Sequence, residues 1–527
     1  MRDLNLEAWE NELENDFDKT FLLHGIAFGF DIANQENLPV DILAKNHPSA
    51  LPGSQLYEKA HLQILNEIEC GNYVLTLSSP RIISPLGVIP KPDGGVRLIH
   101  DCSRPDGTAV NDFVGHFEKQ RFQTIDDAAN LVSKDYYMSK VDLKSPYRSV
   151  SINAKSQEVT GSQWTFPDGR EYTFFDKKLP FGSKLALGIF HRLSQAMRRM
   201  MSRRGFTIVA YLDDFLICES KDRCRLALNA LVHLLRKLGF MINWSNVVDP
   251  TTSVTFLGIE IDSSTMELRL PADKLSLLRL ELDNFKVHKR ASKKQLQSLD
   301  GKLNWESAVI QGGRVFLHRI IDCITSLKRD WHKILLKGEV LADISWWRKF
   351  MAKFNGKSLL LDKLAITSIC TDACHIGAGG YYQDDWFYAN WVVDFPFANN
   401  LHINELEAFS VVLETLRWAK QKSDYFFSDN MATVTCLNKG TSKHRTLMSY
   451  LRHLYWLSAS FNFHIVVLHV LGKDNVLADN ISWLHESSSF IYFVRYCLPA
   501  PLRLIHLHEH MSNAALSFLL SRHVKYQ

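Results

Sequence analysis

The chain has 527 residues, a length that predicts several packed domains rather than one. Hydrophobic residues make up 46% and charged residues 22%, which are globular values, and the formal charge is only +4, so the total charge argues for no particular partner. The nine cysteines form no CxxC pair, no apolar run reaches the roughly 18–20 residues that span a bilayer, and the start is acidic, which together exclude a secreted or membrane-spanning protein and favour an intracellular one, in the cytoplasm or nucleus.

The predicted elements of the first half begin after a weakly structured segment. Residues 1–60 mix short apolar clusters with Asn, Pro and acidic side chains, which predicts an acidic arm. In 82–101, β-branched runs alternate with Pro and Asp-Gly-Gly, which predicts a hairpin that turns at 93–95. We then expect a helix at 126–132, a strand at 136–145, a strand with a glycine turn at 172–184, a helix at 186–204, a hairpin at 206–220, a helix at 222–238 and a strand at 254–262.

The second half changes character twice. Residues 271–350 are expected to be mainly helical, and they hold 16 Lys and Arg against nine Asp and Glu, interleaved with aromatic residues. Such a stretch is typical of a surface that a polyanion follows, although a solvated helical face is the alternative. From 368 on, a β-rich block, a helix at 404–421, a strand ending at 429, a helix at 430–438, a strand at 464–470 and a late helix predict a mixed sheet flanked by helices.

Three aspartates end apolar strands in the first half. Asp213 and Asp214 lie at the tip of the hairpin IVAYLDDFLI, and Asp142 ends the strand before it. Bare carboxylates at apolar strand ends repel one another unless a cation lies between them. Three such groups fit a site for two Mg²⁺ ions that performs phosphoryl transfer, although an Asp-Asp pair alone is also an ordinary polar turn.

The surrounding motifs resemble the fingers and palm of reverse transcriptases. SPLGVIPKPDGGVRLIHD, VDLKSPYRSV, LPFGSK, YLDD, LGFMIN and TFLGIEID occur in the order and spacing of that family over roughly 70–262. The resemblance implies that Asp142, Asp213 and Asp214 hold Mg²⁺, two ions per site with Mn²⁺ as a substitute. It also implies that the following residues bind the incoming nucleotide: Lys91 and Arg97 on the fingers hairpin, the main chain from Leu143, Tyr147 as the ring that excludes a ribose 2′-hydroxyl, and Gly182 where the backbone approaches the nucleotide.

A second ordered set of acidic residues follows. TDACHIGAGG, INELEA, SDNMATV and HVLGKDNVLADNIS resemble the motifs of ribonuclease H, whose acidic residues hold two Mg²⁺ ions to hydrolyse the RNA strand of an RNA–DNA hybrid. Taken singly, each acid is also a helix cap or a surface charge. The resemblance assigns the ligands as Asp372, Glu405, Asp429 and Asp479, and a mobile histidine as His469.

Together the two resemblances predict an α+β and α/β multidomain chain: a right-hand polymerase with fingers, palm and thumb, followed by a ribonuclease H-like mixed-sheet domain. The expected segments are the acidic arm at 1–60, fingers and palm at 61–265, a helical and basic thumb and connection at 266–362, the ribonuclease H-like domain at 363–488 and a tail at 489–527. The expected partners are an RNA template, a DNA primer, their hybrid and deoxynucleoside triphosphates. The cations that would grip the phosphates of the hybrid are Lys286, Lys289, Arg290, Lys293 and Lys294.

RLIHDCSRPDGTAVND, GSKLALGIFHRLSQA and QLQSLDGKLNW resemble the DIRS-type retrotransposons, in which a tyrosine recombinase accompanies the polymerase, and the chain is then expected to be a piece of a longer element or a truncated copy. Departures from the usual residues are Pro146, Leu187, Asn246, Leu471 and Trp483. They leave open a decayed or domesticated protein that binds nucleic acid without catalysis. An RNA-templated RNA polymerase is a third reading, which Tyr147 and the ribonuclease H motifs disfavour.

Overall fold

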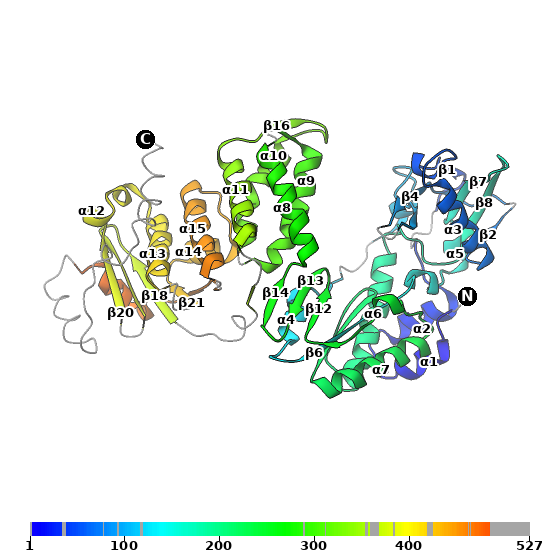
Figure 1. The fold of residues 1–527 in the computed structure, drawn as a ribbon, viewed down its shortest axis with the longest axis horizontal. Coiled ribbons are helices and arrows are strands. Elements are labelled where there is room, and N and C mark those ends of the chain that lie inside the picture. The colour runs from blue at the N-terminus through cyan, green and yellow to red at the C-terminus, as the bar shows by residue number, and fades with distance from the viewer. Residues whose placement is uncertain are drawn as a thin grey trace. The chain divides into compact units, whose positions relative to one another are not determined.

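The computed structural model describes residues 3–484 except 34–37, 77, 92–93, 116–119, 288–289, 311, 354–356, 359–367, 383–384, 419–424, 462 and 464. The expected tail at 489–527 therefore lies outside the described residues. The chain divides into two compact units, Met1–Leu257 and Gly258–Gln527. Figure 1 shows the fold with its elements labelled. Within the described part of the chain, no helix is long and apolar enough to cross a membrane.

The N-terminal segment is folded, and the expectation of a weakly structured arm was wrong. Helices α1 (Leu6–Glu12) and α2 (Lys19–Phe28) bury Trp9 and Leu22 in the core of the first unit. The acidic side chains between the helices face basic ones on α6 (Ala186–Arg203), where Asp16 Oδ1 lies 2.7 Å from Nη2 of Arg199. The segment looked disordered in the sequence because the arginines that neutralise it lie far along the chain.

The fingers region of the first unit contains a sheet and a separate hairpin. The sheet has the order β1-β3-β7-β8-β2, and its strands are β1 (Ile42–Leu43), β2 (Tyr73–Leu75), β3 (Ile82–Ile83), β7 (Gly161–Thr165) and β8 (Glu171–Asp176). The predicted hairpin is confirmed as β4 (Leu86–Pro90) and β5 (Val96–His100). Helix α3 (Tyr57–Glu69) packs against β2 and β5.

The palm of the first unit is a four-stranded sheet of order β11-β6-β10-β9. Its strands are β6 (Tyr137–Asp142), β9 (Ile208–Tyr211), β10 (Asp214–Glu219) and β11 (Val248–Thr251), and its helices are α4 (Ile125–Leu131), α5 (Ala154–Gln157), α6 and α7 (Lys221–Lys237). Helices α6 and α7 pack on the sheet and bury an apolar core that includes Phe190 and Phe215. The predicted hairpin and both long helices are thus confirmed.

The strand expected at 254–262 is broken in two. Strands β12 (Ser253–Phe256) and β13 (Ile259–Asp262) are separated by Leu257 and Gly258, whose φ angles of 46° and 75° are left-handed and cannot continue a strand. In the second unit, β13 pairs with β14 (Glu267–Arg269), which pairs with β17 (Lys357–Ser358).

Residues 271–350 are mainly helical, as predicted. The helices are α8 (Ala272–Val287), α9 (Lys293–Glu306), α10 (His318–Ser326) and α11 (Gly338–Lys353). Strands β15 (Arg290–Ser292) and β16 (Lys333–Leu335) pair antiparallel as a small two-stranded sheet. Part of the aromatic content of this stretch builds its core. Trp347 is buried, and the ring of Trp346 stacks on Phe316 with centroids 3.7 Å apart. These rings hold the helices together and are not a free stacking surface.

The C-terminal sheet has the order β20-β19-β18-β21-β22, and it confirms the predicted mixed sheet flanked by helices. Strands β18, β21 and β22 are parallel, whereas β19 and β20 are antiparallel to their neighbours. The strands are β18 (Ser368–Ala373), β19 (Gly377–Tyr382), β20 (Asp385–Asn390), β21 (Tyr425–Ser428) and β22 (Val466–His469).

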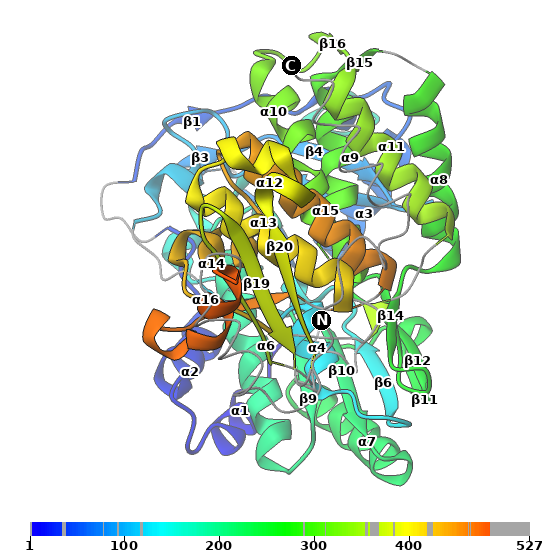
Figure 2. The ribbon, with the colours of Figure 1, turned by 90° about the vertical axis from the view of Figure 1, so that its left-hand side faces the viewer.

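The helices of this sheet are α12 (Trp391–Asp394), α13 (Ile403–Trp418), α14 (Met431–Lys439), α15 (Arg445–Phe461) and α16 (Val476–Ser482), and Figure 2 shows α12 and α13 beside β19 and β20. The sequence did not predict α15, which is rich in aromatic and serine residues with modest helix propensity. Its packing against α13, with Tyr450 stacked on Phe409, stabilises the helix where its intrinsic helix propensity is modest.

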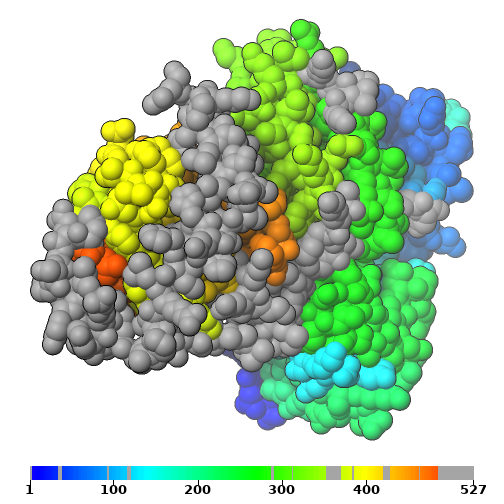
Figure 3. All heavy atoms as spheres, turned by 60° about the vertical axis from the view of Figure 1, so that its left-hand side comes forward, coloured from blue at the N-terminus to red at the C-terminus, as the bar shows by residue number. Residues whose placement is uncertain are grey.

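Segment 391–400 lies on the surface, yellow in Figure 3, and exposes Val392 and Val393.

Candidate active sites

The three predicted aspartates of the first unit meet at one end of the palm sheet. Strand β6 pairs antiparallel with β10 in a register that sets Asp142 directly opposite Asp214. Strands β9 and β10 are joined by a two-residue turn of Leu212 and Asp213, in which Leu212 has a φ of 52°. The amide of Leu143 donates to the carbonyl of Asp213 at 3.1 Å and fixes this turn against β6. The fold therefore gathers residues that lie 71 positions apart in the chain.

Two of these carboxylates, Asp213 and Asp214, are costly to ionise without a cation. Burial, together with the neighbouring carboxylates of Asp214 and Asp142, raises the pKa of Asp213 to about 6. Burial also raises the pKa of Asp214, although Lys140 opposes this effect because its Nζ lies 3.1 Å from Asp214 Oδ1. A divalent cation bound here would relieve this repulsion, so the residues present fit such an ion.

Sequence reasoning missed three side chains that hold these carboxylates. Lys140 precedes Asp142 by two positions on β6, so strand alternation places both on one face of the sheet. Asn243 and Asn246 each donate from Nδ2 to Asp142 Oδ2 at 2.8 Å. The period-two spacing could have revealed Lys140, but nothing in the sequence connects the asparagines to a strand a hundred residues earlier.

The predicted nucleotide-binding residues lie along one flank of the palm. The Arg97 guanidinium carbon lies 5.1 Å from the centre of the Phe181 ring, and Phe181 makes an edge contact with Tyr147. Tyr147 also stacks on Phe190 of α6, and burial raises its pKa. Arg97 is exposed and Tyr147 is half-buried, and both contact the Phe181 ring.

Gly182 occupies a position that no other residue fits. Its φ is 142°, and a Cβ there would lie 2.0 Å from the carbonyl oxygen of His100 on the fingers hairpin. Lys91 follows the last residue of β4 and is exposed. Its backbone amide donates to the carbonyl of Gly95 at 2.8 Å and closes the hairpin turn. Leu143 is buried, and its amide is committed to the Asp213 carbonyl rather than free for a phosphate.

The departures from the usual polymerase residues have ordinary places in the fold. Pro146 is the first residue of a short 3-10 turn, Pro146–Ser149, where its missing N–H costs nothing. The residue before it, Ser145, adopts φ 49°, outside the right-handed helical region that proline disfavours there. Leu187 is exposed on the first turn of α6. None of these residues disturbs the carboxylate group.

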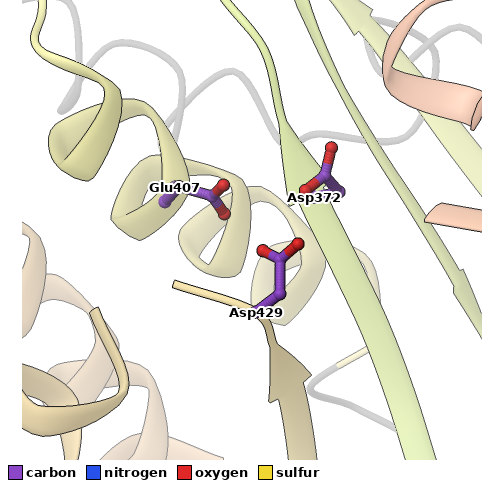
Figure 4. A group of neighbouring side chains, drawn as sticks. All are labelled: Asp372, Glu407 and Asp429. Carbon is purple, nitrogen blue, oxygen red and sulfur yellow. The ribbon is translucent and has the colours of Figure 1, made fainter. Parts of the chain in front are cut away.

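A second carboxylate group lies in the C-terminal sheet (Figure 4). Ligand oxygens of Asp372 on β18, Glu407 on α13 and Asp429 after β21 lie within 4.8 Å of one another, and among the described residues this is the one such group of three. Burial and the carboxylate of Asp429 raise the pKa of Asp372 to about 7. Burial and both aspartates raise the pKa of Glu407 well above its ordinary value. The set of oxygen donors fits one or more hard divalent cations.

The helix residue in this group is Glu407 and not the predicted Glu405. Glu405 is the third residue of α13, and its carboxylate accepts the amide of His402 at 2.9 Å, as in a capping box. It also lies 3.2 Å from Nδ1 of His444. INELEA contains both glutamates, and the capping pattern around Glu405 is the signal that could have assigned that residue to the helix end and left Glu407 for the site.

The remaining predicted residues of this site surround the group. Asp479 is exposed on α16, and its charge contributes to the raised pKa values of Asp372 and Asp429. His469 is exposed at the end of β22, where its Nε2 lies 3.1 Å from the carbonyl oxygen of Asp429. Sequence reasoning missed Ser482, whose hydroxyl donates to Asp372 Oδ2 at 3.0 Å.

The predicted hybrid-binding cations are only partly described. Arg290 is exposed on β15, Lys294 is exposed on the first turn of α9, and Lys293 beside it is half-buried. Lys286 belongs to α8, and Lys289 lies outside the described residues. Arg290 lies on β15 and the two lysines on the first turn of α9, which a capping box of Ser292 and Gln295 begins directly after that strand.

Fingers above a palm sheet that carries paired aspartates at a strand tip define the fold of a right-hand polymerase. Residues 89–261 match the family model for "Reverse transcriptase (RNA-dependent DNA polymerase)". The genome polyproteins of two isolates of Petunia vein clearing virus, Shepherd and Hohn, are each 24% identical over 385 residues, which cover 68% of this chain. The chain matches 16% of the length of those relatives.

Solved structures share the fold at low sequence identity. The foamy viral protease-reverse transcriptase in complex with double-stranded DNA matches with a TM-score of 0.52 and 16% identity, over 90% of this chain and 98% of that chain. The same enzyme in complex with an RNA/DNA hybrid matches with a TM-score of 0.51 and 15% identity, over 89% and 64% of the two chains. These matches confirm the predicted polymerase fold.

Proposed function

We propose that the chain copies RNA, and then DNA, into DNA at the palm carboxylates. The observation that carries the proposal is the register that sets Asp142 opposite Asp214 with Asp213 in the turn, inside the segment that matches the reverse transcriptase family. Asp142, Asp213 and Asp214 would hold two Mg²⁺ ions, with Mn²⁺ as a substitute. When bound, such ions stabilise the charge on the attacking and leaving oxygens of an in-line displacement.

The protein's own residues bind and orient the nucleotide in this proposal. Arg97 supplies a cation for the β- and γ-phosphates, and Lys91 supplies a second one on the same hairpin. Tyr147 is held by Phe181 and Phe190, so its ring cannot turn aside for a ribose 2′-hydroxyl. Replacement of Tyr147 by Val should therefore admit ribonucleotides. Preferential ribonucleotide use by the unmodified protein would instead support an RNA polymerase.

The test is primer extension on poly(rA)/oligo(dT) with Mg²⁺. Asp213→Asn should abolish incorporation, whereas Asp222→Asn, an exposed aspartate on the first turn of α7, is the matched control and should retain it. Extension unchanged in Asp213→Asn would refute the assigned site.

We also propose ribonuclease H activity at the second carboxylate group, with Asp372, Glu407, Asp429 and Asp479 as the Mg²⁺ ligands. The close approach of three buried or half-buried acids supports it, as does an exposed His469 suited to proton transfer or product release. Its substrate is the RNA strand of the hybrid that the polymerase makes.

An assay of RNA–DNA hybrid cleavage decides whether Glu407 or Glu405 on α13 belongs to this site. Asp429→Asn and Glu407→Gln should abolish cleavage while primer extension survives. Glu405→Gln should retain cleavage, because a glutamine at this position still caps the helix. Loss of cleavage in Glu405→Gln with full cleavage in Glu407→Gln would return the role to Glu405.

We propose that the protein is encoded by a DIRS-type retrotransposon and acts inside the cell, in the cytoplasm or nucleus. A tyrosine recombinase of the same element is its proposed partner. The alternative is a decayed or domesticated protein that binds nucleic acid without catalysis. The palm aspartates lie at one sheet end, three acids of the second group lie close together, and Pro146 fits its turn, which favours an active enzyme. Hybrid binding measured beside extension decides, since binding without incorporation at any Mg²⁺ or Mn²⁺ concentration would support the alternative.

A further inference from the structure

One oxygen of Asp142 is held by two neutral donors. Nδ2 of Asn243 and Nδ2 of Asn246 both lie 2.8 Å from Asp142 Oδ2. Asp214, by contrast, is held by the ammonium of Lys140, which cancels part of its charge. Amide donors orient a carboxylate and leave its full negative charge for a cation.

The backbone fixes Asn243 beside the strand end. The amide of Asn243 donates to the carbonyl of Asp142 at 2.9 Å, and the amide of Lys144 donates to the carbonyl of Met241 at 2.9 Å. Leu143 and Ile242 form the bridge between these bonds. Segment 241–243 therefore lies antiparallel to 142–144, and this pairing holds the backbone of Asn243 beside Asp142.

The side chains are also fixed in orientation. Ser245 donates its hydroxyl to Oδ1 of Asn243 at 2.8 Å, which leaves Nδ2 of Asn243 facing the carboxylate. Asn246 ends the 3-10 turn Trp244–Asn246, and its amide donates to the carbonyl of Asn243 at 3.0 Å. The turn thus delivers a second amide to the same oxygen.

We propose that Asn243 and Asn246 are positioning residues of the polymerase centre, which hold Oδ2 of Asp142 so that Oδ1 is presented to the divalent cation. The inference rests on the proposed polymerase function. It gives a role to Asn246, one of the positions at which the sequence departs from the usual polymerase residues. Partners that hold a ligand in place typically contribute ten- to a hundredfold in metal affinity, because the ligand does not have to be ordered when the ion binds.

The first experiment measures binding without catalysis. Full-length protein carrying Asp372→Asn and Asp429→Asn has a disabled second site, and Mn²⁺ titration followed by the paramagnetic resonance of free Mn²⁺ then reports the palm site. Adding Asn246→Ala should weaken this binding about tenfold. Ser245→Ala should weaken it less, since it frees only the Asn243 amide. Asn229→Ala, an exposed asparagine on α7, is the control and should leave binding unchanged.

The second experiment measures primer extension against Mg²⁺ concentration. Asn246→Ala should raise the half-saturating Mg²⁺ concentration about tenfold and approach the normal rate at saturation. Because Asn246 is exposed, its replacement should leave the unfolding temperature of the metal-free protein unchanged.

The outcomes separate this inference from the function on which it rests. If Asp213→Asn does not remove the palm Mn²⁺ site, the proposed function fails. If Asp213→Asn removes the site but Asn246→Ala binds Mn²⁺ as tightly as the parent, the function stands and the positioning role is overturned. A lower maximal rate at an unchanged half-saturating Mg²⁺ concentration would also overturn it.

Discussion

The buried carboxylates of the C-terminal sheet should make the metal-free protein less stable as the pH rises, and Asp372→Asn should remove much of this effect. The ordinary pKa of an aspartate is 3.8, and that of Asp372 is raised to about 7 by burial and by Asp429. At about 1.36 kcal/mol per pH unit of pKa change, ionised Asp372 costs about 4 kcal/mol in the folded metal-free protein.

The direction of the effect follows from proton binding. Between pH 3.8 and about 7 the folded state holds a proton on Asp372 that the unfolded state has released, so the free energy of unfolding falls as the pH rises through this range. Asparagine cannot ionise, so the variant should be the more stable protein at pH 8 and not at pH 4. Urea unfolding at both pH values in a chelator measures the difference.

Added Mg²⁺ provides the second arm of the same assay. At pH 8 it should stabilise the unmodified protein more than Asp372→Asn, because the ion relieves the repulsion that the variant lacks. Glu405→Gln is the matched control, since Glu405 lies on the same helix as Glu407 but outside the group. A pH dependence that is unchanged in Asp372→Asn, or lost equally in Glu405→Gln, would refute the reasoning.

Two further predictions concern the first unit. Gly182→Ala should abolish or strongly reduce primer extension and lower the free energy of unfolding by about 2 kcal/mol, because the added Cβ meets the carbonyl of His100 at a strained φ. Extension assays and urea unfolding measure the two effects, and a variant normal in both would contradict the proposed close approach. Arg199→Met should destabilise the protein by about 3 kcal/mol in thermal unfolding, because it strips the main partner from the buried carboxylate of Asp16. Arg225→Met, at an exposed ion pair, is the control and should cost less than about 1 kcal/mol.

Local pattern was enough to predict most elements of the chain. The period-two alternation and turn residues predicted the β4–β5 and β9–β10 hairpins, and helical periodicity predicted α6 and α7 within a residue or so at each end. Strand-end aspartates were also readable, because a charge after an apolar run is conspicuous in the sequence. These features depend on neighbours a few residues away.

The errors have a common cause. The acidic N-terminal segment folds because arginines nearly two hundred residues later neutralise it, and α15 forms because α13 packs against it. The strand expected at 254–262 is broken at Leu257, whose backbone is left-handed. Leucine rarely adopts this conformation, and the surrounding sequence does not predict it.

The sequence by itself revealed two sets of carboxylates, in an order that resembles a polymerase and a ribonuclease H. Only the tertiary structure decided which oxygens meet. It brought Glu407 rather than Glu405 to Asp372, and it aimed Asn243 and Asn246 at Asp142. The physical reason is that helix phase and strand register fix the direction of a side chain, and both are set by packing between segments that lie far apart in the chain.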